Sequence, residues 1–222
     1  MKEAKDFYNE FAPKLLADYA HGNPRTEAAI RYAVSKIPAS ARRILDLGCG
    51  IGWSSGEIKR ALPAAAVLGV DLSPQLIETA AALFATPDLA FAAADLTQAG
   101  LDLAPPFDAI VMLDVYEHIP REARGRLHQQ LARLLGPEGI LLLTFPSVSH
   151  QEFLKQCHPD QIQPVDELIH EPDLQQLARD RGGRLFRGRR GGLRFGGLGF
   201  GDRLGRRLLQ KLRGSLGGRL LR

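Results

Sequence analysis

The sequence predicts an α/β fold in which a doubly wound, mostly parallel sheet of seven strands follows an N-terminal helical extension. From residue 42 onward, short apolar runs alternate with stretches of helical spacing, which is the pattern of βαβ units. The first apolar run leads directly into closely spaced glycines, at the strand end where such sheets bind ligands. The chain has 222 residues and is 45% hydrophobic, so it can bury the core that this sheet needs.

The expected elements follow one another along the chain. Helical spacing ahead of the sheet covers about residues 4–37. The parallel strands are expected at 44–47, 66–70, 89–92, 107–113 and 139–145, with helices at 53–62, 74–84 and 121–135. Ser73 is a favoured N-cap and Pro74 suits the first helical position, so the second of these helices is expected to begin there. After the fifth strand come a longer connection, a short helix and a sixth strand, at 146–170, 172–181 and 184–187.

The charge of the chain is unevenly distributed. The net charge is +4, but residues 187–222 alone carry +10 and residues 1–186 carry −6. We therefore expect an N-terminal helical cap (1–40), a core (41–186) and a basic tail (187–222). An acidic body argues against a globular domain built to track nucleic-acid phosphates.

Three features favour a soluble, cytoplasmic protein. Two cysteines, Cys49 and Cys157, do not make a disulfide framework. The N-terminus has acidic residues where a signal peptide needs an apolar core. The longest strongly apolar stretch, 139–145, is far too short to span a bilayer.

Glycines and acidic residues occupy the expected strand ends. Gly48, Gly50 and Gly52 follow the first strand, which contains Asp46, and allow a ligand to approach the backbone closely. Asp71 ends the second strand, where a carboxylate can accept hydrogen bonds from both hydroxyls of a ribose. Asp95 and Leu96 follow the third strand, where they can contact an adenine. One aspartate alone would suggest a turn or a cap, whereas three at consecutive strand ends favour a ligand.

These residues belong to a set of motifs that resembles the class I S-adenosylmethionine-dependent methyltransferases, which have a Rossmann-like fold. The motifs are ILDLGCGIG, LGVDLS, AAADL, FDAIVMLDVYEHIP and LLGPEGILLLTFPS, in the family's order. The pattern GxGxG differs from the GxGxxG of dinucleotide-binding proteins. The resemblance implies S-adenosylmethionine as the cofactor, with contacts from Asp46, Gly48, Gly50, Gly52, Asp71, Leu72, Asp95, Leu96 and Leu113.

Within this family, the chain looks most like the ubiquinone-biosynthesis O-methyltransferases. In those proteins an arginine ahead of the glycine motif helps to bind the cofactor, and the similar stretch here is Asn23-Pro24-Arg25. Arg25 could pair with the methionine carboxylate. The alternative is a solvated arginine at the start of a helix.

Candidate catalytic residues follow the fourth strand. Methyl transfer requires alignment and sometimes the removal of a proton, for which His118 and Glu117 are the candidates. Asp114, Glu117 and His118 are weak candidates for a divalent metal site, because some relatives bind a metal with Glu-x-x-Glu-His. Here aspartate replaces the first glutamate, so we expect no metal. In the simpler alternative, Glu117 and His118 only form a wall of the pocket.

Candidate acceptor-binding residues lie in two regions, the connection after the fifth strand and the N-terminal helical region. They are Tyr19, His150 and His158. In the family, the N-terminal region often covers the pocket. The alternatives are an irregular surface loop for the histidines and core packing for Tyr8, Phe11 and Tyr19.

The basic tail has two interpretations. The family fold ends in an antiparallel hairpin, which here would fall near residues 184–200, a stretch poor in strand formers. The tail is therefore either a degenerate hairpin followed by a disordered extension or a basic segment that contacts nucleic acid or an anionic surface.

The sequence thus predicts a methyltransferase that uses S-adenosylmethionine to methylate a small molecule, at oxygen rather than at nitrogen or carbon. The alternatives are an RNA-directed methyltransferase or RNA-binding protein that uses the tail, and a catalytically silent cofactor-binding protein. The acceptor and the oligomeric state are not determined by the sequence.

Overall fold

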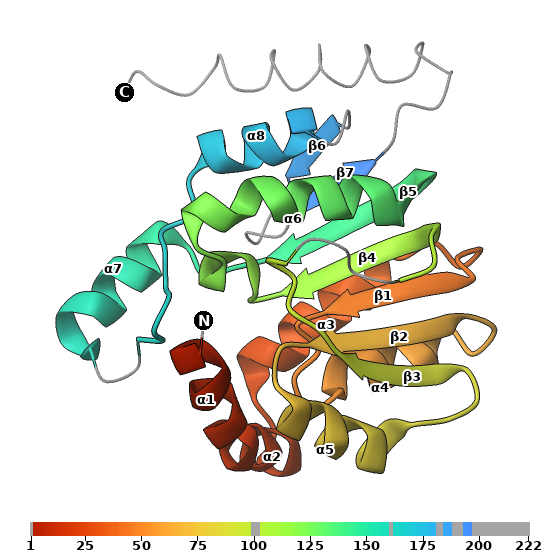
Figure 1. The fold of residues 1–222 in the computed structure, drawn as a ribbon, viewed down its shortest axis with the longest axis horizontal. Coiled ribbons are helices and arrows are strands. Elements are labelled where there is room, and N and C mark those ends of the chain that lie inside the picture. Colours follow the sequence, from red (N-terminus) through yellow and green to blue (C-terminus); the bar gives the residue numbers. More distant parts are fainter. Residues whose placement is uncertain (1, 99–102, 160–161, 181–183, 188–192, 197–222) are drawn as a thin grey trace, which may run out of the picture.

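The computed structural model describes residues 2–98, 103–159, 162–180, 184–187 and 193–196. Within these ranges the strands form one seven-stranded sheet in the order β3-β2-β1-β4-β5-β7-β6 (Figure 1). The parallel strands are β1 (Arg43–Leu47), β2 (Ala66–Asp71), β3 (Leu89–Ala93), β4 (Phe107–Leu113) and β5 (Leu135–Thr144). The expected α/β fold with a parallel sheet is confirmed.

The first strand of the chain, β1, lies in the interior of the sheet. β1 lies between β2 and β4, so the strand order runs outward in both directions from β1. At such a reversal the loops after neighbouring strands diverge to opposite faces of the sheet and leave a crevice at the carboxyl ends. The fold therefore predicts a ligand site next to the glycines that follow β1.

Helices bury both faces of the parallel sheet. On one face, α3 (Pro24–Lys36) and α4 (Trp53–Ala61) share a core with Ile44 of β1 and Val111 of β4. On the other face, α6 (Arg121–Leu134) and α8 (Glu171–Asp180) share a core with the alternate strand residues Leu45 and Ile110. Burial on both faces explains why these strands read as continuous apolar runs.

The predicted start of the helix after β2 is confirmed. α5 (Pro74–Phe84) has Pro74 in its first turn, and the Ser73 hydroxyl accepts a hydrogen bond from the Leu76 backbone N–H at 3.2 Å. This cap places the end of β2, with Asp71, directly ahead of a helix N-terminus.

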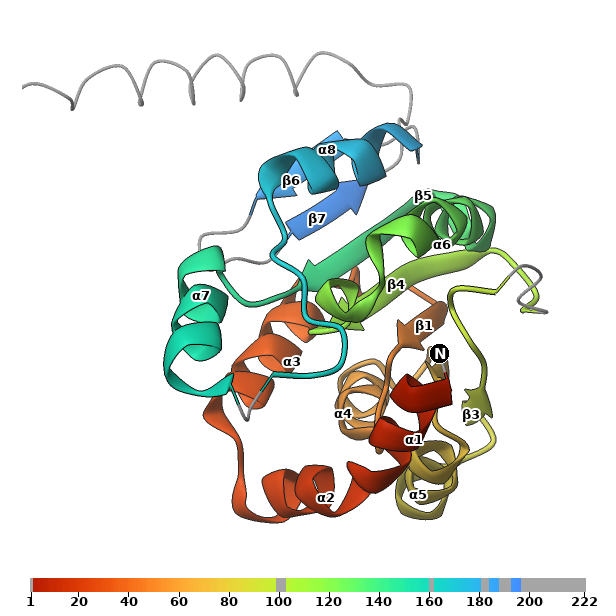
Figure 2. The ribbon, with the colours of Figure 1, turned by 60° about the vertical axis from the view of Figure 1, so that its left-hand side comes forward.

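The N-terminal region is helical, as expected, but is broken into α1 (Lys2–Glu10), α2 (Ala12–His21) and α3. The second break lies at Gly22, which has a φ of 85°, and at Asn23, whose side chain accepts from the backbone N–H groups of Arg25 and Thr26. Figure 2 brings the carboxyl-end side of the sheet forward and shows α1 beside it.

The connection after β5 contains a helix that the sequence analysis did not predict. α7 (Val148–Cys157) begins at Ser147, whose hydroxyl accepts from the His150 backbone N–H. Its exposed Phe153 and mixed polar sequence gave little apolar periodicity to recognise. β5 also begins earlier than expected, at Leu135, because it continues directly from α6.

At the C-terminal side, β6 (Arg184–Arg187) and β7 (Leu193–Gly196) pair antiparallel, with β7 beside β5. Most of the predicted basic tail, from residue 197 onward, lies outside the described residues. None of the helices in the described ranges has the length and apolar character that crossing a membrane requires.

Candidate functional site

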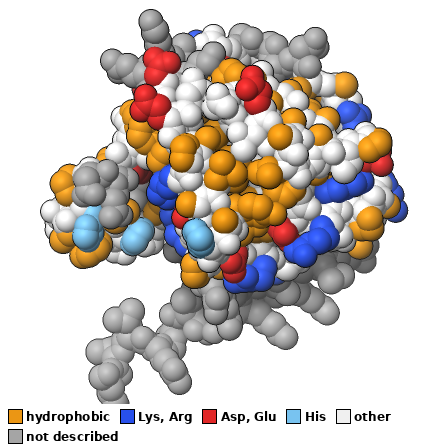
Figure 3. Space-filling view, turned by 90° about the horizontal axis from the view of Figure 1, so that it is seen from below, with side chains coloured by type: hydrophobic (Ala, Val, Ile, Leu, Met, Phe, Trp, Pro, Cys, Tyr) orange, Lys and Arg blue, Asp and Glu red, His pale blue; other side chains and the backbone are white. Residues whose placement is uncertain are grey.

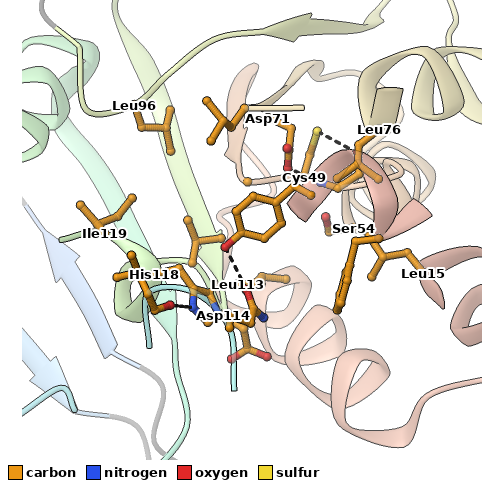
Figure 4. A pocket seen from close by; sticks show the side chains of 18 of the residues that line it. Leu15, Cys49, Ser54, Asp71, Leu76, Leu96, Leu113, Asp114, His118 and Ile119 are labelled. Carbon is orange, nitrogen blue, oxygen red and sulfur yellow. Dashed lines mark hydrogen bonds between the residues drawn. The ribbon is translucent and has the colours of Figure 1, made fainter. Parts of the chain in front are cut away.

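A pocket of about 420 Å³ lies at the carboxyl ends of β1, β2 and β4, where the strand order reverses. Its volume is in the range of small-molecule sites. Figure 4 shows side chains from several elements around one common space. Nine residues predicted from the sequence line it: Gly48, Gly50, Asp71, Leu72, Asp95, Leu96, Leu113, Asp114 and His118.

The glycine loop forms the floor of this pocket. Gly48 and Gly50 line it with positive φ angles of 73° and 56°. A Cβ on Gly48 would lie 2.3 Å from Cγ2 of Val115, so the loop after β4 packs directly on this backbone. Gly52 does not line the pocket, since it packs against the Phe91 ring instead. The first two glycines therefore bring the backbone to the ligand space, and the third serves helix packing.

Replacing Gly48 with alanine is expected to lower the free energy of unfolding by about 2–3 kcal/mol, because the new Cβ combines a strained φ with a clash against Val115. Urea unfolding measures this. Gly125→Ala is the matched control: a Cβ at this position of α6 meets nothing within 4 Å, so stability should rise by up to about 1 kcal/mol. Equal stabilities of the Gly48 variant and the parent chain would contradict the packing described for the loop.

Asp71 lies at the end of β2 with its carboxylate facing the glycine loop. Oδ2 accepts from the Gly50 backbone N–H at 2.9 Å, and Oδ1 accepts from the Ser73 N–H at 3.0 Å. Burial raises the pKa of this carboxyl above its usual value, against the lowering effect of these hydrogen bonds. The side chain is thus held in one orientation at the pocket wall, and Leu72 lines the pocket next to it.

Asp95 and Leu96 line the pocket after β3, and Leu113 lines it at the end of β4. Oδ1 of Asp95 accepts from both the backbone N–H and the hydroxyl of Thr97, at 2.8 and 2.6 Å. Leu96 is buried. A carboxylate thus lies next to an apolar side chain at the pocket wall, and the contact of this pair with an adenine stays a prediction.

Asp46 lies beneath the loop and does not line the pocket. Its Oδ2 accepts from the hydroxyls of Ser54 and Ser55 at 2.5 and 2.6 Å. Burial raises its pKa to about 6, although these two hydrogen bonds oppose the rise. Ser54 does line the pocket, so Asp46 orients a hydroxyl group of the pocket wall.

Arg25 also lies outside the residues that line the pocket, but its guanidinium reaches one that does. Nη2 lies 2.9 Å from Oδ2 of Asp114, which directly follows β4 and has an unusual φ of 54°. A non-glycine residue in the left-handed region is typical of constrained functional loops. The ion pair ties the start of α3 to this loop.

His118 projects into the pocket from the short 3-10 turn η1 (Tyr116–His118). Its Nδ1 lies 2.7 Å from the Val165 carbonyl oxygen. A carbonyl can only accept, so in the neutral ring Nδ1 carries the proton and Nε2 keeps its lone pair. Burial lowers the pKa of His118, although the Val165 carbonyl opposes this effect. The ring is therefore a neutral, oriented proton acceptor.

Glu117 is completely buried beside this ring, and neither of its carboxyl oxygens has a hydrogen-bond partner. Its Oε1 lies 3.9 Å from Nε2 of His118. Burial, and secondly the charge of Asp114, raise the pKa of Glu117 well above its usual range. The Glu117 backbone carbonyl accepts from the Glu167 N–H at 3.0 Å, which holds the segment of Val165 against η1.

For Tyr8 and Phe11, the sequence analysis weighed core packing against a cover over the pocket, and both residues line the pocket. Tyr8 lies on α1, Phe11 is the N-cap of α2, and Leu15 of α2 lines the same wall. The Tyr8 hydroxyl donates to Oε1 of Gln163 at 2.9 Å. The aromatic spacing at positions 8 and 11 was visible in the sequence, but core packing explains such spacing equally well. The hydrogen bond to Gln163 joins two segments that no sequence motif connects.

The three residues predicted to bind an acceptor do not line the pocket. Tyr19 is partly exposed and packs against Trp53 and Phe84. Figure 3 shows hydrophobic side chains gathered on one face of the molecule. His150 and His158 lie at the two ends of α7, and His158 packs against Phe153. Their role in acceptor binding stays a prediction.

Within the described ranges, no group of three or more His, Cys, Asp or Glu side chains is arranged to hold a metal ion. Asp114, Glu117 and His118 were the weak candidates. In the structure, Asp114 pairs with Arg25 instead.

Comparisons with known proteins agree with this geometry. Residues 44–139 match the model of a methyltransferase domain family. Trans-aconitate 2-methyltransferase of Methylobacterium radiotolerans is 38% identical over 138 residues, which are 62% of this chain and 50% of that protein. The protein of the same name from Escherichia coli is 29% identical over 78% of this chain and 61% of its own length. The chain thus spans about half to three fifths of these two relatives.

Solved structures share the fold. A TehB-like S-adenosylmethionine-dependent methyltransferase from Corynebacterium glutamicum has a TM-score of 0.64 at 22% identity, over 87% of this chain and 99% of its own. Magnesium protoporphyrin IX methyltransferase from Synechocystis, with bound S-adenosylmethionine, has a TM-score of 0.55 at 22% identity, over 78% and 77% of the two chains.

Proposed function

We propose that the chain is an S-adenosylmethionine-dependent methyltransferase of class I that acts on a small molecule, which the match of residues 44–139 to a methyltransferase domain family supports. One observation carries this proposal: Asp71 and Asp95 line the same pocket as the glycine loop, from the ends of neighbouring strands. A nucleoside offers a ribose diol and a base amino group, which are the donors that two such carboxylates need.

The residues present fit this cofactor. Asp71 would accept from the ribose hydroxyls and Asp95 from the adenine, with Leu72 and Leu96 against the ring. The backbone of Gly48 and Gly50 would lie along the methionine portion, where a side chain on Gly48 has no room. Asp46 would act on the cofactor site indirectly, by holding the Ser54 hydroxyl. Arg25 would act on it through its ion pair with Asp114. No metal is assigned a role.

We propose oxygen as the acceptor atom and His118 as the general base. When bound, S-adenosylmethionine would supply a methyl group. The methyl carbon would bond to the acceptor oxygen while the carbon–sulfur bond breaks and its electron pair stays on sulfur. Nε2 of His118 would take the hydroxyl proton, because His118 lines the pocket and its Nδ1 is already engaged in donating to Val165. Burial raises the pKa of Glu117, which disfavours a second negative charge beside this ring.

The remaining expectations stay proposals. We keep the division into a cap (1–40), a core (41–186) and a basic tail (187–222), and a cytoplasmic location. The RNA-directed alternative rests on the tail, most of which lies outside the described residues, and no contact described for this chain favours it.

Titration calorimetry with S-adenosylmethionine is expected to show saturable binding. Methyl-labelled S-adenosylmethionine, incubated with the protein and a metabolite extract, should then yield a labelled small molecule with a methyl–oxygen bond, identified by mass spectrometry and NMR. Binding without transfer would instead indicate a silent cofactor-binding protein. Label in RNA would indicate the RNA-directed alternative, and a methyl–nitrogen or methyl–carbon bond would refute oxygen as the acceptor atom.

A further inference from the structure

The Arg25 guanidinium, which reaches the loop after β4, is already paired. Its Nη2 lies 2.9 Å from Oδ2 of Asp114. Among the described residues that line the pocket, the one guanidinium is that of Arg126, on α6, and Glu122 lies one helical turn before it. The Arg25 guanidinium is therefore already neutralised where it reaches the loop that carries His118.

Two carboxylates and one guanidinium act electrostatically on His118. Asp114 and Asp166 both act on the ring as carboxylates, and the charge of Arg25 opposes theirs. Asp166 is held by the amide of Gln151, a neutral group, so its charge is not compensated there. An anion bound beside the ring would be repelled by these groups, whereas a neutral or cationic molecule would not.

Much of the remaining pocket wall is apolar. Phe11, the N-cap of α2, and Leu15 of α2 line it, as do Val115 and Ile119 of the loop after β4, and the Tyr8 hydroxyl is already engaged by Gln163. A carboxylate needs several aligned donors when it leaves water, and these walls supply few.

Building on the proposed function, we propose that the acceptor is a hydroxyl compound without carboxylate or phosphate groups, and that Asp114 sets this specificity by neutralising Arg25. The chain would thus differ from its relatives named for trans-aconitate, a polycarboxylate. The acceptor would pass its hydroxyl proton to Nε2 of His118 as its oxygen bonds to the methyl carbon, whose bond to sulfur breaks with the electron pair staying on sulfur.

Three phenols of nearly equal size test the charge preference: 4-hydroxybenzoate, its neutral amide 4-hydroxybenzamide, and the cationic 4-hydroxybenzylamine. Calorimetry on the protein saturated with S-adenosylhomocysteine should give at least about tenfold tighter binding of the amide and the amine than of the benzoate. Trans-aconitate should not bind. Methyl-transfer rates, where measurable, should rank in the same order.

The variant Asp114→Asn frees Arg25 and keeps the side-chain shape, and asparagine tolerates the positive φ at this position. It should shift the ratio of benzoate to amide affinity by about tenfold toward the benzoate. Adding Arg25→Gln to this variant is the matched control and should remove the gain.

The proposal would be overturned if the parent chain bound the three phenols with equal affinity or bound none of them. Binding of trans-aconitate would also overturn it. An unchanged ratio in Asp114→Asn would overturn the role of Asp114. Failure of S-adenosylhomocysteine itself to bind would count against the proposed function and is observed separately, before any acceptor is added.

Discussion

Asp71→Ala is expected to weaken the binding of S-adenosylmethionine by about 100-fold, because two hydrogen bonds to a charged carboxylate are lost at once. The loss has a second physical source. The same carboxylate accepts from the backbone of Gly50 and Ser73, so alanine leaves a part-buried and a buried N–H group without their partner and releases the glycine loop. Calorimetry measures the affinity, and thermal unfolding establishes that the variant is folded.

Ser73→Ala is the matched control for this experiment. Ser73 is buried beside Asp71 and caps α5, but it does not line the pocket. Its replacement should lower stability by about 1 kcal/mol and leave the affinity for S-adenosylmethionine nearly unchanged. If folded Asp71→Ala binds as tightly as the parent chain, Asp71 does not hold the ribose.

The strand-end aspartates and glycines were predictable because a parallel sheet brings the carboxyl ends of its strands together. Gly48, Asp71 and Asp95 needed only their position at strand ends to be placed in one pocket, and the structure brings them there. Local signals of the same kind predicted the cap at Ser73.

Side-chain partners distant in sequence could not be predicted in this way. Arg25 was expected at a cofactor carboxylate, but the path of the N-terminal helices sets its guanidinium against Asp114. Asp46 was expected beside the cofactor, but the first turn of α4 directs two serine hydroxyls onto it. Such pairings depend on how helices rotate and pack, which apolar periodicity does not specify.

The acceptor side was predicted least well, because its residues come from segments without motifs. His150 and His158 were chosen as polar residues of a loop, yet that loop contains α7, which carries both away from the residues that line the pocket. His118 was predicted from its place after the fourth strand. Its orientation depends on Val165, 47 residues later in the chain.

His118→Asn is expected to lower kcat by about 100- to 10,000-fold, the contribution of a positioned general base. Asparagine keeps a side-chain N–H that can donate to the Val165 carbonyl, as Nδ1 does, but it has no nitrogen lone pair in place of Nε2. The affinity for S-adenosylmethionine should therefore stay within about threefold, so that the loss falls on kcat. The assay uses the acceptor identified by label transfer. His21→Asn, at the exposed end of α2 and outside the pocket lining, is the control that should retain full activity.

The pH dependence separates a base from a structural residue. A base must be unprotonated, so activity is full above the pKa of His118 and is lost as the pH falls through it. Burial lowers this pKa, so the parent enzyme should keep its activity to a lower pH than an ordinary histidine, with a pKa of about 6.5, would allow. In His118→Asn this acidic limb should disappear, and the rate should rise with pH as the acceptor hydroxyl ionises in solution. A variant that retains the acidic limb, or loses less than about tenfold in kcat, would show that alignment alone drives the transfer and that His118 only forms a wall of the pocket.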